Sequence, residues 1–175
     1  MSTTDQERTE QYAEGIAETV RTLETLATVD LTDPDELAEL DGSELTTLVE
    51  VIDFPARLDY FRTAGTVAYE ALAEHAAEYL EDHGGSIVET WLEGVLDIEA
   101  TYRRSIGTAG DVDPDTIAVV VTVGGPDARV YLDDIDGRAR IDVQWWGSSA
   151  RRYLHAPNLA ARVYELEEIT REAIR

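Results

Sequence analysis

The spacing of apolar residues changes along the chain, from a helical period to strict alternation. Residues 5–28 carry apolar side chains at three- and four-residue intervals, which predicts a first helix. Two short helices follow, and residues 56–81 repeat the helical pattern over a longer stretch, with Gly65 on the apolar stripe. After one more short helix the pattern ends, so we predict a helical part over residues 1–93.

Alternation begins at Leu96 and predicts an antiparallel sheet over residues 94–155. One expected strand, residues 116–123, is apolar on both faces, as in a central strand that is buried on both faces of the sheet. Turns rich in glycine, proline and aspartate separate the others. The expected strands are 96–103, 116–123, 128–133, 139–146 and, as a short fifth strand, 151–154.

Helices followed by consecutive strands are typical of an α+β protein. We expect the N-terminal helices to pack on a four- to five-stranded antiparallel meander sheet. Pro157 opens a C-terminal helix over residues 157–175, where proline suits the first helical position. With 175 residues, the chain is predicted to form a single domain, residues 1–175.

Acidic residues dominate the charge. The chain has 37 acidic and 14 basic residues, a formal net charge of −23, and every basic residue is an arginine. Self-repulsion of this size destabilises a compact chain in dilute buffer, whereas molar salt screens it at a Debye length of about 3 Å. We therefore predict a protein of a salt-accumulating halophile. An acidic mimic of nucleic acid is the alternative, but it does not explain the absence of lysine.

The acidic residues are concentrated in the helical half. Residues 1–100 hold 25 acidic residues and 4 arginines, whereas residues 101–175 hold 12 and 10. An anionic partner should therefore meet the second half. Without cysteine, a long apolar run or a basic, apolar leader, the chain is expected in the cytoplasm, with no membrane contact and no disulfides.

Three blocks of the predicted sheet resemble a known family. They are Leu96-Asp97-Ile98-Glu99, Gly124-Gly125-Pro126 with Tyr131, and Trp145-Trp146-Gly147. In order and spacing they are similar to the LDIEY, GGPNIY and YWWG blocks of small uncharacterised prokaryotic and phage proteins that end in an acidic helix. The resemblance covers residues 90–170, although Asp127 and Gln144 depart from the family pattern. It implies the fold and adds no chemistry.

Cofactor and metal motifs are not apparent. The turn at Gly124 lacks the lysine and the following helix of a phosphate-binding loop, so we interpret it as a hairpin corner. The three histidines, His75, His83 and His155, are not spaced as a zinc site, which needs three or four ligands. We expect neither a cofactor nor a metal.

Asp97 and Glu99 are the candidate catalytic residues. They share one face of the first strand, about 7 Å apart by the rise of a strand. Two carboxylates at this distance can act as acid and base in hydrolysis, or bind Mg²⁺, in a metal-dependent hydrolase or a nucleic-acid-processing enzyme. The favoured alternative is a set of cross-strand salt links with arginine.

The outward sheet face is the candidate binding surface. Alternation places five arginine and aromatic residues on it: Arg103, Arg129, Tyr131, Arg140 and Trp146. This mixture suits base stacking and phosphate contact, but outward Val120 favours a face covered by the C-terminal helix or by a second subunit. We predict a non-catalytic interaction module that acts through this face or as a homodimer, with a protein partner favoured over nucleic acid.

Overall fold

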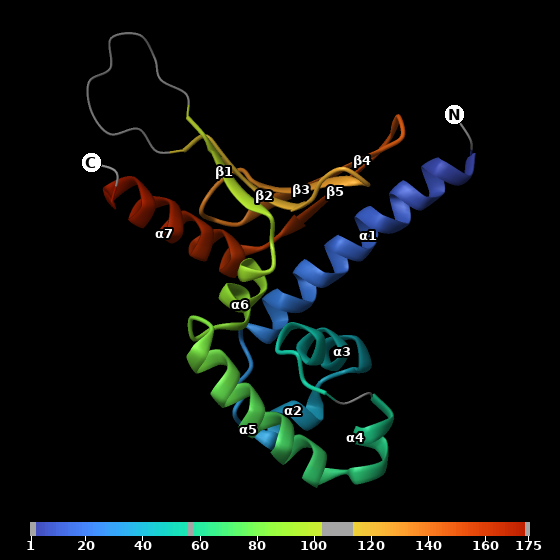
Figure 1. Ribbon diagram of the computed structural model, residues 1–175, viewed down its shortest axis with the longest axis vertical. Helices are drawn as coiled ribbons and strands as arrows, with labels where there is room; N and C mark the ends of the chain where they lie inside the picture. Colours follow the sequence, from blue (N-terminus) through green and yellow to red (C-terminus); the bar gives the residue numbers. More distant parts are fainter. Residues whose placement is uncertain (1–2, 56–57, 103–113, 174–175) are drawn as a thin grey trace. The chain divides into compact units, whose positions relative to one another are not determined.

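The computed structural model describes residues 3–55, 58–102 and 114–173 (Figure 1). Within these ranges, helices precede an antiparallel sheet of five strands and a further helix follows it, so the predicted α+β class is confirmed. The elements are α1 (Thr3–Leu26), α2 (Pro34–Glu39), α3 (Gly42–Val51), α4 (Leu58–Ala64), α5 (Thr66–Asp82), α6 (Ile87–Glu93), β1 (Asp97–Thr101), β2 (Thr116–Thr122), β3 (Asp127–Leu132), β4 (Arg138–Trp145), β5 (Ser148–His155) and α7 (Pro157–Ala173).

Contacts divide the chain into two compact units. Residues 1–18 and 95–175 form the sheet unit, and residues 19–94 form the helical unit. One boundary falls inside α1, after Glu18, and the other falls after Gly94, one residue from the predicted change in patterning at residue 93. The single domain expected from chain length stays a prediction.

The sheet is a meander in which each strand pairs with the next, in the order β1-β2-β3-β4-β5. The hairpin between β4 and β5 is tight, because Trp145 pairs with Ser148 and only Trp146 and Gly147 lie between them. Both have positive φ, 49° and 82°, which is the type I′ geometry that matches the twist of the strands.

This hairpin corrects the sequence prediction in two places. Trp146 was expected at the end of a strand and lies in the turn instead. The fifth strand, expected over 151–154, extends over Ser148–His155 and therefore begins three residues earlier than predicted.

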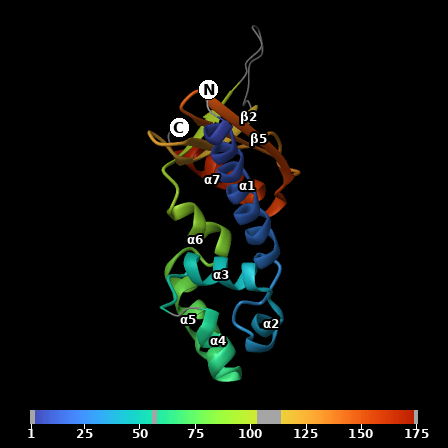
Figure 2. The same cartoon turned by 90° about the vertical axis from the view of Figure 1, so that its right-hand side faces the viewer.

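One face of the sheet, the inner face, packs against helices. Its residues Val119, Val130 and Ile141 have no exposed surface, and Val163 of α7 is equally buried. Figures 1 and 2 show α7 and the first turns of α1 beside the sheet.

Polar contacts confirm that both helices lie on the inner face. The hydroxyl of Tyr102, just after β1, donates a hydrogen bond to Glu167 of α7. At the other side of the sheet, Arg152 of β5 lies 2.7 Å from the carboxylate of Glu14 in α1. The inner face therefore provides the core of the sheet unit.

The helical unit is built around α5. Helices α2 and α4 contact α5, and α3 contacts α6. Asp41 caps α3 in a capping box with Glu44, and the Ser86 hydroxyl accepts a hydrogen bond from Glu89 N–H at the start of α6. Leu37, Leu48 and Leu72 are fully buried in its core.

The long helix expected over residues 56–81 is interrupted. It is divided into α4 and α5 at Gly65, whose φ of 58° and ψ of −135° leave the helical region. Glycine adopts this conformation without steric cost. Gly65 is exposed in the structure, so its predicted place on a buried stripe is wrong. No helix in the described ranges has the length and apolar character needed to span a bilayer.

Candidate interaction surface

The second face of the sheet, the outer face, points away from α7. Strand register fixes its members, because residues paired across an antiparallel sheet share a face. They are Asp97, Glu99 and Thr101 on β1; Thr116, Ala118 and Val120 on β2; Asp127, Arg129 and Tyr131 on β3; Arg138, Arg140, Asp142 and Gln144 on β4; and Ser149, Arg151, Tyr153 and His155 on β5.

A first group of charges crosses the face from β3 to β1. Arg129 Nη1 donates a hydrogen bond to Glu99 Oε2 at 2.5 Å, and Arg129 Nε donates one to Asp127 at 3.3 Å. Arg129 reaches Glu99 across β2, where Val120 and Ala118 lie between them in the register and are buried. The hydrogen bond to Glu99 is the main reason that the pKa of Arg129 is raised above its ordinary value.

A second group is centred on Asp142 of β4. Arg151 donates two hydrogen bonds to its carboxylate, at 2.5 and 2.9 Å, and this contact raises the pKa of Arg151. Arg140 Nε lies 3.3 Å from the same carboxylate. The Arg140 guanidinium also stacks on Tyr131, with its Cζ 4.5 Å from the ring centroid, a cation–π contact between paired residues of β3 and β4.

These pairs neutralise the face. Its strand residues include four carboxylates and four arginines, a formal charge of zero with His155 neutral, although the whole chain carries −23. One of these arginines, Arg138, pairs with Asp134 of the β3–β4 turn and not with a carboxylate of the face. Ion pairs this exposed contribute little to stability, because water and salt screen them. Their main effect is therefore to make one balanced surface on a strongly acidic protein.

The structure brings together three of the five predicted binding residues. Arg129, Tyr131 and Arg140 lie side by side on the outer face. Trp146 lies at one end of the sheet and is 85% exposed. With Asp127 and Gln144 it lines a hollow of about 520 Å³ between the β2–β3 and β4–β5 turns. Arg103 lies outside the described residues.

Among the arginine and tyrosine residues of this face, the sequence prediction missed Arg138, Arg151 and Tyr153. Arg151 and Tyr153 on β5 continue the rows of Arg129 and Tyr131, and Tyr153 is 70% exposed. The alternation from Ser149 to His155 would have identified them if the fifth strand had been started at Ser148. The predicted cover by the C-terminal helix is wrong, since α7 occupies the inner face.

Asp97 and Glu99 do share a strand face, as predicted. Glu99 is engaged by Arg129, and Asp97 accepts a hydrogen bond from Ile98 N–H at 2.8 Å. Within the described ranges no group of three or more metal-ligating side chains occurs. The geometry therefore favours a structural use of Glu99, and the hydrolase alternative gains no support from it.

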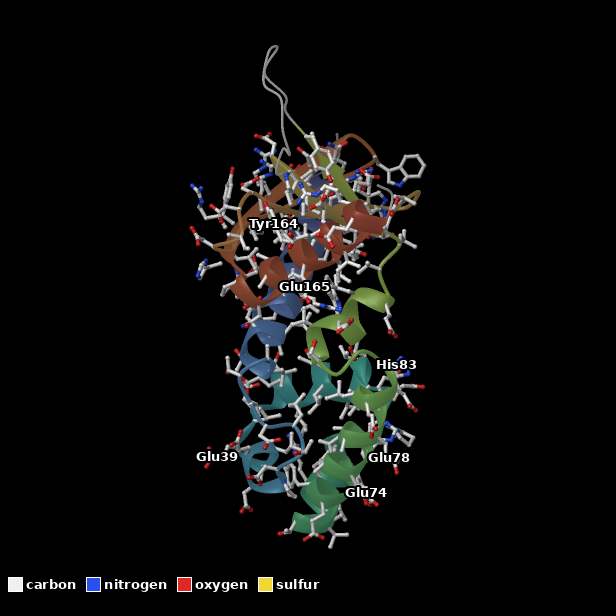
Figure 3. The ribbon with its side chains drawn as sticks, turned by 90° about the vertical axis from the view of Figure 1, so that its left-hand side faces the viewer. Glu39, Glu74, Glu78, His83, Tyr164 and Glu165 are labelled. Atoms are coloured by element: carbon white, nitrogen blue, oxygen red, sulfur yellow. The ribbon has the colours of Figure 1, made fainter. Side chains whose placement is uncertain are left out.

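His75 on α5 and His83 just after it make contacts within the helical unit. His75 Nε2 lies 2.9 Å from the carbonyl of Ile52, and His83 Nδ1 lies 2.7 Å from the Glu93 carboxylate. Figure 3 shows His83 just beyond the end of the helix that carries Glu74 and Glu78. The His83 ring also stacks on Tyr79, with centroids 4.2 Å apart. These contacts hold the C-terminal end of α5.

The chain matches no protein-family model, no curated protein and no solved structure. The resemblance of residues 90–170 to a family of small prokaryotic and phage proteins therefore stays a prediction. Function has to be argued from the surfaces of this chain alone.

Proposed function

We propose that this protein is a non-catalytic interaction module of a halophile cytoplasm, and that its outer sheet face binds the same face of a second copy. The charge balance of that face is the observation that supports the proposal most strongly. Elsewhere the chain is so acidic that two copies repel each other. The outer face is where they can approach without that repulsion.

The distribution of charge across the face favours a second copy. The β1 side presents Asp97 and Glu99, and the β5 side presents Arg151. A two-fold axis parallel to the strands places β1 of each copy over β5 of the other, so carboxylates meet guanidinium groups. An isologous interface of this kind is self-complementary. A nucleic acid would instead meet a strongly like-charged protein.

Aromatic side chains add contact area from the middle strand to the β5 side of this interface. Tyr131 and Tyr153 flank Arg140 in one row across β3, β4 and β5. Tyrosine and arginine are enriched at the energetic centres of protein interfaces because they combine apolar area with hydrogen bonding.

The area of the face predicts a weak dimer. Five strands span about 19 Å, and eight residues extend about 27 Å, which gives on the order of 500 Å². A stable interface buries about 800 Å² on each partner. We therefore expect a reversible, concentration-dependent dimer. Molar salt should strengthen it, because salt screens the repulsion between the acidic surfaces of the two copies.

Sedimentation velocity in molar KCl over a range of protein concentrations tests this proposal. Tyr153→Glu places an unpaired charge on the face without disturbing a buried site, and it should abolish the dimer. Ile135→Glu is the matched control, because Ile135 is 60% exposed in the β3–β4 turn, off the outer face. This variant should dimerise like the unmodified chain.

Two results would overturn the proposal. One is a chain that stays monomeric at millimolar concentration in molar KCl. The other is a dimer that Tyr153→Glu and Ile135→Glu affect equally.

A further inference from the structure

A groove runs along the free side of strand β1, on the inner face of the sheet. Among the described strands, β1 pairs only with β2, so its other side is an edge of the sheet. Beside this edge lies a cavity of about 400 Å³ between β1 and α7. Its lining residues are Ile98, Ala100, Tyr102, Leu166, Glu167, Thr170 and Arg171.

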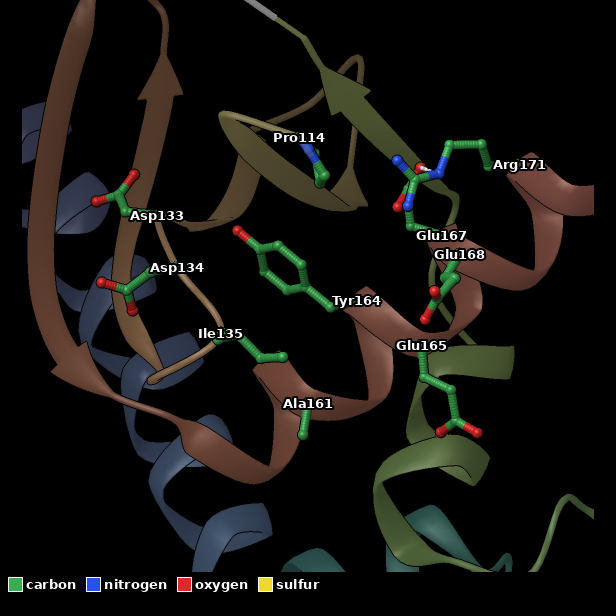
Figure 4. A pocket seen from close by; sticks show the side chains of 10 residues that line it. All are labelled: Pro114, Asp133, Asp134, Ile135, Ala161, Tyr164, Glu165, Glu167, Glu168 and Arg171. Atoms are coloured by element: carbon green, nitrogen blue, oxygen red, sulfur yellow. Dashed lines mark ion pairs between the residues drawn. The ribbon is translucent and has the colours of Figure 1, made fainter. Parts of the chain in front are cut away.

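The walls of this groove are largely apolar. Ile98, Ala100 and Leu166 line it and are each partly exposed. Outside this lining, Leu96 just before β1 and Ile169 on α7 are more than half exposed. Tyr102 and Glu167 connect the walls at one point through their hydrogen bond. Figure 4 shows Glu167 and Arg171 as an ion pair on α7, at the border with a neighbouring pocket.

We infer that this groove binds an extended segment of a partner protein, which adds as a sixth strand beside β1. An edge strand presents N–H and C=O groups that such a segment can use, and a helix alongside supplies a wall for its side chains. One of these groups, Ile98 N–H, donates to the Asp97 side chain, so it has to exchange that local hydrogen bond for one to the segment. Groove-facing residues of the segment meet Ile98, Ala100 and Leu166 and are therefore apolar. The alternate residues point to the outer face.

The charge of the outer face next to β1 determines which side chains the alternate residues of the segment should have. They lie beside Asp97 and Glu99, which β1 presents on the outer face. Oppositely charged neighbours across strands are stabilising and like charges are destabilising. The bound segment therefore alternates apolar with basic residues.

The same rule disfavours a second copy of this chain at the edge. Two β1 strands paired together would set carboxylates against carboxylates. The β5 edge already has part of its backbone occupied, since Ser149 O accepts from the Gln6 side chain and Arg151 O from the Arg152 guanidinium. A segment from a different protein fits better.

The test uses a synthetic peptide, acetyl-Val-Arg-Val-Arg-Val-Arg-amide, titrated calorimetrically into the full chain in moderate salt. The control peptide is acetyl-Val-Val-Val-Arg-Arg-Arg-amide. It has the same composition and charge, but as an extended strand it cannot place its apolar side chains on one face and its basic side chains on the other. We expect at least tenfold tighter binding of the alternating peptide. Amide exchange should slow at Ala100 when it binds, and less at Ile98, whose N–H already donates to Asp97.

Two matched variants locate the site. Thr170→Trp fills the groove from the exposed side of α7 and should reduce binding at least tenfold. Glu172→Trp puts the same side chain on α7 outside the groove lining and should leave binding unchanged. Equal binding of the two peptides, or equal behaviour of the two variants, would overturn the inference.

Discussion

Gly137 is the position where one added methyl group should cost the most. It lies in the turn between β3 and β4 with φ of 91°, and its carbonyl accepts a hydrogen bond from Ala156 N–H at 2.8 Å. A Cβ atom at Gly137 would lie 2.5 Å from Pro157 N and 2.8 Å from Ala156 C. These are backbone atoms at the junction of β5 and α7, so they cannot rotate away.

The cost of Gly137→Ala has two parts. Positive φ costs an L-residue roughly 1–2 kcal/mol. Forcing an extra carbon into a packed site costs about 1–3 kcal/mol more. The free energy of unfolding should therefore fall by about 2–5 kcal/mol, and a chain of this length loses roughly 2–4 °C in Tm for each kcal/mol.

Two other glycines of the same unit separate these parts. Gly124 has φ of 88° and open space around its Cβ position, so Gly124→Ala should show only the backbone cost of roughly 1–2 kcal/mol. Gly125 has open space and no positive φ. Gly125→Ala should be neutral or stabilise by up to about 1 kcal/mol, because alanine restricts the unfolded chain.

Thermal unfolding in constant molar salt, followed by near-ultraviolet circular dichroism, gives the three Tm values. The expected order is Gly125→Ala above Gly124→Ala above Gly137→Ala. Equal Tm values for the Gly137 and Gly124 variants would refute the close approach of the β3–β4 turn to Pro157.

Two further predictions concern single contacts of the sheet unit. The hydrogen bond to Glu167 raises the pKa of Tyr102 above 10, so its contribution to stability is complete below pH 10 and disappears as pH rises through that higher value. The stability difference between the unmodified chain and Tyr102→Phe should shrink above pH 10 in urea titrations, and a constant difference would contradict the contact. Trp146 has φ of 49° in the β4–β5 turn, where asparagine is preferred. Trp146→Asn should therefore raise the free energy of unfolding by up to about 1 kcal/mol, and a loss of stability would show that the exposed indole packs against the protein.

The local sequence predicted much of the sheet unit. Alternation from Leu96, the glycine turn at Gly124 and the apolar run of β2 each depend on the conformational preferences of a few neighbouring residues. The structure confirms these predictions. The same reasoning failed where one residue controls the backbone. Gly65 fits a helical stripe by spacing, but its φ and ψ end α4.

For the candidate site, alternation alone placed Arg129, Tyr131 and Arg140 on one face, because strand geometry alternates side chains whatever the tertiary fold. Tertiary packing decided which face meets solvent. Tyr102 and Arg152 connect α7 and α1 to the inner face, and no local pattern records which face a distant helix will cover. The shared face of these three residues follows from sequence, whereas its full charge balance, its separation from both helices, and the groove beside β1 follow only from the tertiary structure.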